Sequence, residues 1–140
     1  MLAWAARYDA TAVGFGRTGR GQIAASWAVQ QLGKPYQWGA VGPASFDCSG
    51  LSLRAWQAAG IALPRVAAQQ YGAGTHLPVI DAPPGDLVFY ATDPADPATI
   101  DHVGLALGDG RMVDAPFTGA VVRIETIGGS GLVALATRPG

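Results

Sequence analysis

A chain of 140 residues, 49% hydrophobic and only 14% charged, is long enough for one domain with a buried core and too apolar to be disordered. A net charge of −1 excludes the strongly basic surface that nucleic-acid and anionic-membrane binding requires. No apolar run approaches the ~18 residues of a membrane span, so we expect no membrane insertion.

The N-terminal 20 residues are predicted to be a lead-in or linker, and residues 21–140 to be a single catalytic domain. Glycines alternate with arginines over residues 16–21, and no apolar period is present there. The apolar residues 1–6 are too few for a signal peptide and follow no basic region. If the protein acts outside the cell, its signal lies outside this chain.

Three helices are predicted next along the chain. Apolar residues at helical spacing indicate a helix over residues 22–32, which Gly33 and Pro35 end, and a second over 48–59, which Gly60 ends. A shorter helical patch covers residues 66–72. The large aromatic residues Trp38 and Trp56 are expected in the core.

After residue 84 the pattern changes from helix to strand. Short apolar stretches at 87–90, 102–107, 111–115, 120–125 and 132–137 alternate with turns rich in glycine and proline. Helices followed by an antiparallel meander predict an α+β fold with the helices on one face of the sheet. The sequence shows no repeat.

The single cysteine, Cys48, is placed where the second helix begins. Asp47 precedes it and is a good N-cap, because a carboxylate accepts hydrogen bonds from the free N–H groups of the first turn. The helix dipole favours an anion there, so the thiol is expected to ionise more readily than a free cysteine, whose pKa is roughly 8.5. Cys48 is therefore a candidate nucleophile, or else a small buried residue of the core.

A cysteine nucleophile needs a base, and the chain offers two histidines. His76 falls in a polar loop and is predicted to be a surface residue. His102 opens an apolar strand, from which a base can be directed across the sheet toward a helix N-terminus. His102 is the better candidate, with a structural role as the alternative.

Asp114 is the candidate that orients His102, provided that the hairpin loop has the right length. If residues 108–110 form a three-residue loop, Gly104 lies opposite Asp114, and Asp114 is diagonal to His102 on the same face. A two-residue turn would place Asp114 on the opposite face. The alternative for Asp114 is a solvated carboxylate at the sheet edge, and Asp109 is expected to be only a turn residue.

Five blocks of the sequence together resemble the NlpC/P60 cysteine peptidase family, and within it the mycobacterial Rip-type endopeptidases. The blocks span about residues 22–127 in the family's order, and they are Tyr36-Gln37-Trp38-Gly39, Asp47-Cys48-Ser49-Gly50-Leu51, Leu63-Pro64-Arg65, Gly85-Asp86-Leu87-Val88-Phe89-Tyr90 and Asp101-His102-Val103-Gly104. The resemblance implies a papain-like core, with N-terminal helices packed on an antiparallel sheet of five to six strands. It also implies hydrolysis of peptidoglycan stem peptides at the bond between γ-D-glutamate and meso-diaminopimelate.

The resemblance assigns catalytic roles to three residues: Cys48 as nucleophile, His102 as base and Asp114 as the third member, where most of the family has histidine. Tyr36 matches a tyrosine that helps to hold the oxyanion, unless it is only a core aromatic.

Asp47, Ser49 and Arg65 match residues of the substrate cleft, and Asp47 is implied to be a counter-ion for a free stem-peptide amine. The chain departs from the family at Val66-Ala67, where hydroxyl residues are common.

We further expect a monomer of the cell wall, periplasm or extracellular space. The resemblance implies that it binds peptidoglycan stem peptides, and the net charge indicates that it binds no nucleic acid. No cofactor is expected, and the spacing of one cysteine and two histidines does not suggest a zinc site. Two alternatives stay open: an amidase or acyltransferase of the same fold, and a module that binds peptidoglycan without cleaving it.

Overall fold

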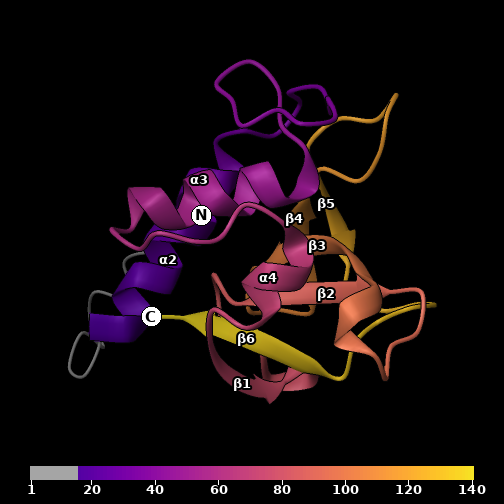
Figure 1. The fold of residues 1–140 in the computed structure, drawn as a ribbon. Helices are drawn as coiled ribbons and strands as arrows, with labels where there is room; N and C mark the ends of the chain where they lie inside the picture. Colours follow the sequence, from indigo (N-terminus) through magenta and orange to yellow (C-terminus); the bar gives the residue numbers. More distant parts are fainter. Residues whose placement is uncertain (1–15) are drawn as a thin grey trace.

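A computed structural model describes residues 16–140, which form helices packed on an antiparallel sheet (Figure 1). The helices are α2 (Gly16–Val29), α3 (Cys48–Ala58) and α4 (Ala67–Tyr71), with short 3-10 turns η1 (Val79–Asp81) and η2 (Pro97–Thr99). The strands are β1 (Gly74–Pro78), β2 (Leu87–Ala91), β3 (Ile100–Ala106), β4 (Arg111–Asp114), β5 (Arg123–Thr126) and β6 (Leu135–Pro139). The predicted α+β class is confirmed.

The first helix begins earlier than its sequence predicts. Residues 16–20, expected to be linker, belong to α2, which ends at Val29 rather than Leu32. A Cβ atom on Gly21 would lie 2.3 Å from the carbonyl oxygen of Pro84, so the helix backbone rests directly on this loop. Such packing outweighs the low helix propensity of glycine. Residues 1–15 of the predicted lead-in lie outside the described residues, and the domain boundary stays a prediction.

The helix α3 matches its prediction closely, because its caps are strong. Oδ1 of Asp47 accepts a hydrogen bond from the Gly50 N–H at 2.7 Å, and Gly60 follows the C-terminal end with a positive φ of 88°. The buried face of α3 includes Leu51, Ala55 and Trp56.

The six strands are ordered β1-β6-β2-β3-β4-β5, and every neighbouring pair is antiparallel. Only β2 to β5 form the predicted meander, because β6 returns to pair with β2 and β1. The segment around His76 was predicted to be a loop and is the edge strand β1. Its alternation of apolar residues is weak, and pairing with β6 supplies the backbone hydrogen bonds that the local sequence does not indicate.

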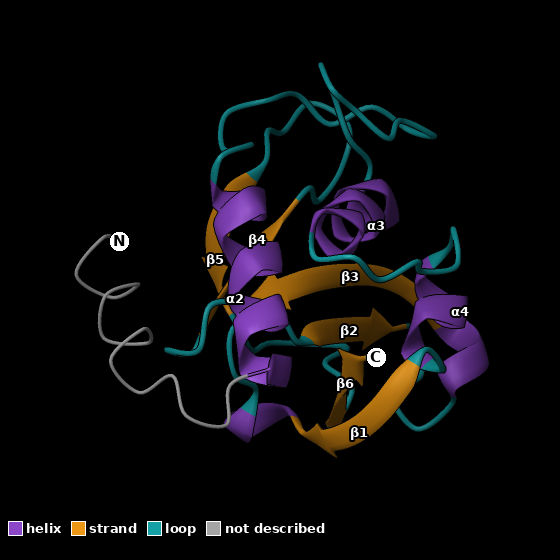
Figure 2. Cartoon of the chain, turned by 90° about the vertical axis from the view of Figure 1, so that its left-hand side faces the viewer, coloured by secondary structure: helices purple, strands orange, loops and turns teal. Residues whose placement is uncertain are grey.

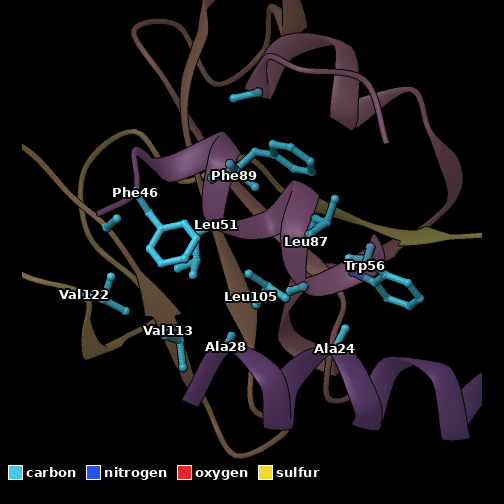
Figure 3. Packing of buried hydrophobic residues seen from close by; sticks show 14 of the residues in the cluster. Ala24, Ala28, Phe46, Leu51, Trp56, Leu87, Phe89, Leu105, Val113 and Val122 are labelled. Carbon is cyan, nitrogen blue, oxygen red and sulfur yellow. The ribbon is translucent and has the colours of Figure 1, made fainter. Parts of the chain in front are cut away.

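Two apolar clusters hold the sheet. The larger lies between the helices and one face of the sheet, and Figure 3 shows Leu51 and Trp56 of α3 meeting Leu87 and Leu105 of the strands. The smaller includes Val88, Ala106, Met112 and Ala136. Figure 2 shows α2 and α3 side by side over the strands. None of the helices within residues 16–140 has the length and apolar character needed to cross a membrane.

Candidate active site

The N-terminal end of α3 presents Cys48 at an open cavity. The cysteine is half-buried and is the first residue of the helix. The Asp47 carboxylate holds the backbone before and after Cys48. Its Oδ1 accepts a hydrogen bond from the Gly50 N–H, and its Oδ2 accepts one from the Gly39 N–H at 2.9 Å. The cysteine is thereby held in a defined position at the end of the helix with the favourable dipole.

The hairpin between β3 and β4 has the three-residue loop on which the prediction for Asp114 depended. Leu105 pairs with Val113 and Ala106 pairs with Met112, so the loop is residues 108–110. The Leu107 N–H donates to the Arg111 carbonyl at 2.8 Å and closes it. Side chains at positions 102 and 114 therefore share one face of the sheet.

His102 and Asp114 are in direct contact. Nε2 of His102 lies 2.8 Å from Oδ2 of Asp114, whose side chain is only 1% exposed, whereas the His102 side chain is 19% exposed. This contact leaves Nδ1 as the ring nitrogen available to a second partner, and the structure brings Cys48 close enough to His102 to affect its ionisation.

The proton affinity of His102 is high. Burial lowers the pKa of its imidazole, but hydrogen bonds with Asp114 and Cys48 and the negative charges of both partners outweigh burial and raise the pKa to about 9. The folded protein therefore favours an imidazolium at neutral pH, placed between a carboxylate and a sulfur.

Tyr36 lines the same cavity as Cys48. Burial raises the pKa of its phenol, and the charges of Cys48 and Asp47 raise it further against the opposing effect of Arg65. The hydroxyl consequently keeps its proton at neutral pH and is available as a hydrogen-bond donor.

Arg65 joins the predicted cleft residues into one group. Its Nη2 lies 2.8 Å from Oδ2 of Asp47, and its Nη1 donates to Oδ1 of Asp47 at 3.2 Å and to Oγ of Ser49 at 2.8 Å. The Asp47 carboxylate thus accepts from two backbone N–H groups and from the guanidinium. Its predicted role as a counter-ion for a substrate amine would require the amine to share Asp47 with Arg65.

The cavity itself has a volume of about 480 Å³ and opens beside Cys48. It is lined by Tyr36, Trp38, Gly39, Asp47, Cys48, Ser49, Arg65, Val66, Ala67, Ala68, Ile100 and Asp101. The prediction for Trp38 was wrong, because this indole is 84% exposed at the rim, while Trp56 is 1% exposed in the core. The glycine turn and polar Gln37 beside Trp38 were the sequence signals for an exposed position. Val66, at 47% exposure, adds an apolar group to the rim.

His76 lies apart from these residues and is exposed, so its predicted place on the surface is confirmed. Its ring stacks on Tyr71 at 4.3 Å between centroids, and its Nδ1 lies 3.2 Å from the Thr137 hydroxyl. Within the described part of the chain, no three His, Cys, Asp or Glu side chains lie close enough together to hold a metal ion.

A cysteine at the start of a helix, packed on an antiparallel sheet that carries a histidine and a polar residue in contact with it, is the arrangement of papain-like cysteine peptidases. The model of the NlpC/P60 family matches residues 33–136. The chain belongs to the NlpC/P60 family of cysteine peptidases.

Individual relatives agree with this assignment. The chain is 42% identical over 104 residues to a probable endopeptidase p60 of Listeria monocytogenes, covering 74% of this chain and 20% of that protein. It is 42% identical over 96 residues to a γ-D-glutamyl-L-lysine dipeptidyl-peptidase of Bacillus subtilis, covering 69% of this chain and 32% of that protein.

Among solved structures, the chain is similar to the peptidoglycan hydrolase RipB of Mycobacterium tuberculosis. The TM-score is 0.75 and the identity 31%, and the match covers 87% of this chain and 65% of RipB. The predicted resemblance to Rip-type proteins is therefore confirmed. The chain spans only a fifth to a third of the length of the two enzymes named above.

Proposed function

We propose that this chain hydrolyses peptidoglycan stem peptides with Cys48 as nucleophile, His102 as general base and acid, and Asp114 as the group that orients His102. The observation that carries the proposal is the 2.8 Å contact between His102 and the buried Asp114, on a histidine whose pKa Cys48 also raises. A buried carboxylate fixes the ring and stabilises its positive charge, as a third catalytic residue must.

The proposed reaction is acyl transfer. The Cys48 thiolate attacks the carbonyl carbon of the scissile amide, and the new oxyanion accepts hydrogen bonds from the Cys48 backbone N–H and the Tyr36 hydroxyl. His102 then gives its proton to the leaving amine as the C–N bond breaks. A water molecule, deprotonated by His102, attacks the thioester and releases the acid and the free thiolate.

The proposed scissile bond joins γ-D-glutamate to the diamino acid of the stem peptide, meso-diaminopimelate being the first choice. The name of the Bacillus relative supports a γ-D-glutamyl acyl group, although the diamino acid in that name is lysine. Asp47 and Ser49, held by Arg65, would line the acyl side of the cleft. Activity on peptidoglycan implies that the protein works at the cell wall or outside the cell.

A second candidate is an amidase or acyltransferase that uses the same three residues on another substrate. The rim residues Val66 and Ala67 favour it, because they lack the hydroxyls that the family commonly presents after the Leu63-Pro64-Arg65 block. The apolar Val66 is half-exposed, so it can contact a less polar acyl group.

The test is digestion of purified muropeptides by the wild type and by Cys48→Ala, followed by mass spectrometry. We expect the wild type to release fragments that end in γ-D-glutamate, and Cys48→Ala to release none while its circular dichroism is unchanged. Products cut at another amide would select the second candidate, and equal turnover by Cys48→Ala would refute both. Cys48→Ser is the matched control for side-chain size.

A further inference from the structure

Behind the contact between His102 and Asp114 lies the single glutamate of the chain, Glu125 of β5. In the β4–β5 pair, Met112 is opposite Glu125 and Asp114 is opposite Arg123. Glu125 is therefore diagonal to Asp114 on the same face of the sheet. Glu125, like His102 and Asp114, is not among the residues that line the cavity beside Cys48.

Asp114 has one oxygen that the catalytic contact does not use. Its Oδ2 faces His102, whereas its Oδ1 is buried and accepts no hydrogen bond from an N–H or hydroxyl group of residues 16–140. A buried acceptor without a donor destabilises the folded state. Two neighbouring groups can donate to it: a carboxylic acid at Glu125, and the buried Nε–H of Arg123, which is opposite Asp114 and has no hydrogen-bond partner among residues 16–140.

Glu125 interacts with this carboxylate. Hydrogen bonding with Asp114, burial and the negative charge of Asp114 raise the pKa of Glu125, against the lowering effect of Arg123. Nη2 of Arg123 lies 3.1 Å from Oε1 of Glu125, which leaves the other carboxyl oxygen free for Asp114. A proton held between the two carboxyl groups would relieve the repulsion between their charges.

We propose that Glu125 is a positioning residue whose protonated carboxyl donates a hydrogen bond to Oδ1 of Asp114 and so holds Oδ2 against the His102 ring. The inference rests on the proposed function, and it adds Glu125 to the three residues Cys48, His102 and Asp114. Three other titratable or charged groups surround the two carboxyls: His102 on β3, Arg123 on β5 and Tyr90 on β2. Burial raises the pKa of the Tyr90 phenol, and the negative charges of Asp114 and Glu125 raise it further.

A neutral hydrogen-bond donor at position 125 should hold Asp114 in place as the protonated glutamate does. Glu125→Gln keeps an N–H that can donate to Oδ1, whereas Glu125→Ala leaves Oδ1 without a partner. The Gln variant also cannot ionise, so it removes any step in a pH profile that belongs to Glu125.

The first experiment is a titration of the wild type labelled with 13C at the glutamate side-chain carboxyl, observed by NMR. One glutamate gives one signal, so no assignment is needed. We expect its midpoint above the ordinary glutamate range, and we expect Asp114→Asn to return it to that range or below. A midpoint at or below the ordinary range in the wild type overturns the proposal, because Arg123 would then dominate.

The second experiment is the rate of Cys48 alkylation by iodoacetamide as a function of pH, which requires no substrate. At pH values below the Glu125 midpoint found in the first experiment, we expect Glu125→Ala to lower the rate about five- to tenfold. Glu125→Gln should retain most of the rate, and its profile should lack the step that belongs to Glu125. Asp109→Asn, on the exposed β3–β4 loop, is the matched control and should follow the wild-type profile. Equal profiles for the wild type and both Glu125 variants, with unchanged thermal unfolding, overturn the proposal.

These readouts separate the two ideas. If muropeptides are not cleaved but the titration and alkylation results are as expected, the proposed function fails and the role of Glu125 stands. If cleavage occurs and the Glu125 variants alkylate like the wild type, the role of Glu125 fails alone.

Discussion

The pKa of His102 is set by opposing electrostatic effects within the site. Burial alone would favour the neutral ring, yet two anionic partners raise its pKa to about 9. The proposed reaction needs that proton for the leaving amine. The rate should therefore be sustained at neutral pH and should fall as the pH rises through about 9, where the imidazolium is lost.

Asp114→Asn tests this balance at the level of one side chain. Without the carboxylate, burial competes only with Cys48, so the pKa of His102 should fall and the alkaline limb of the pH profile should move to lower pH. We also expect kcat to fall by about 10²- to 10⁴-fold, as loss of the orienting carboxylate does in hydrolytic triads. The measurement is kcat/KM against pH on a muropeptide, with the His102 ring followed by NMR.

Asp109→Asn serves again as the control, since its carboxylate pairs with Arg111 on the exposed loop and is distant from the catalytic contacts. An unchanged alkaline limb in Asp114→Asn would mean that Asp114 does not determine the charge of His102.

At the scale of elements, the β3–β4 hairpin determines whether Asp114 reaches His102. The hairpin has no room for a side chain at Gly104, because a Cβ there would lie 2.7 Å from Sδ of Met112 and 3.3 Å from Cβ of Asp114. Met112 ends in a flexible side chain that can shift. Asp114 cannot shift without moving away from His102.

Gly104→Ala should therefore impair the site more than the fold. We expect activity to drop at least tenfold, while the free energy of unfolding falls by about 1–3 kcal/mol, the usual cost of overpacking. Muropeptide kinetics and urea unfolding measure the two effects.

The matched control is Gly72→Ala, whose backbone has an ordinary φ of −84° and whose nearest neighbour, the Gln69 carbonyl oxygen, would be 3.7 Å from the new Cβ. Full activity in Gly104→Ala would show that β4 can move without disturbing the contact between Asp114 and His102.

The same elements show what the sequence can and cannot predict. The bounds of α3 and the strand β3 follow from local signals: Asp47 as a cap, Gly60 as a stop, and apolar periodicity. The start of α2 and the strand β1 depend on distant partners, Pro84 and β6, which no local pattern reveals.

The candidate site divides in the same way. His102 and Asp114 could be proposed from strand alternation once a loop length was assumed, and the loop has that length. Glu125 could not, because its relation to Asp114 depends on the register of β4 with β5 across a long connection. The exposure of Trp38 likewise depends on how the loop before α3 folds over the cavity.

At the scale of the whole molecule, Asp86 lies where the helical layer meets the sheet, directly after the loop against which α2 packs. Its side chain is 2% exposed, with Nε of Arg138 at 3.4 Å from Oδ1 and no partner for Oδ2 among the described residues. Burial raises the pKa of Asp86 to about 6, and Arg138 lowers it only in part. The folded state therefore holds a proton that the unfolded chain releases near pH 3.8.

This difference predicts the direction of a pH effect on stability. Between pH 3.8 and about 6 the folded state binds more protons than the unfolded state, so the free energy of unfolding falls as the pH rises. Asp86→Asn is neutral throughout and avoids that loss. We expect it to unfold with a free energy up to about 3 kcal/mol higher than the wild type at pH 7.5, and with no difference near pH 3.5.

His102 shifts stability in the same direction but in a separate window, between pH 6.5 and about 9, since its folded pKa also lies above its ordinary value. Urea unfolding at pH 3.5, 5, 6.5 and 7.5 thus isolates Asp86, because the gain from Asp86→Asn should be complete by pH 6.5 to 7.5. A variant less stable than the wild type at pH 7.5 would contradict the prediction. It would mean that the ion pair with Arg138 stabilises the fold by more than the burial of the Asp86 charge costs.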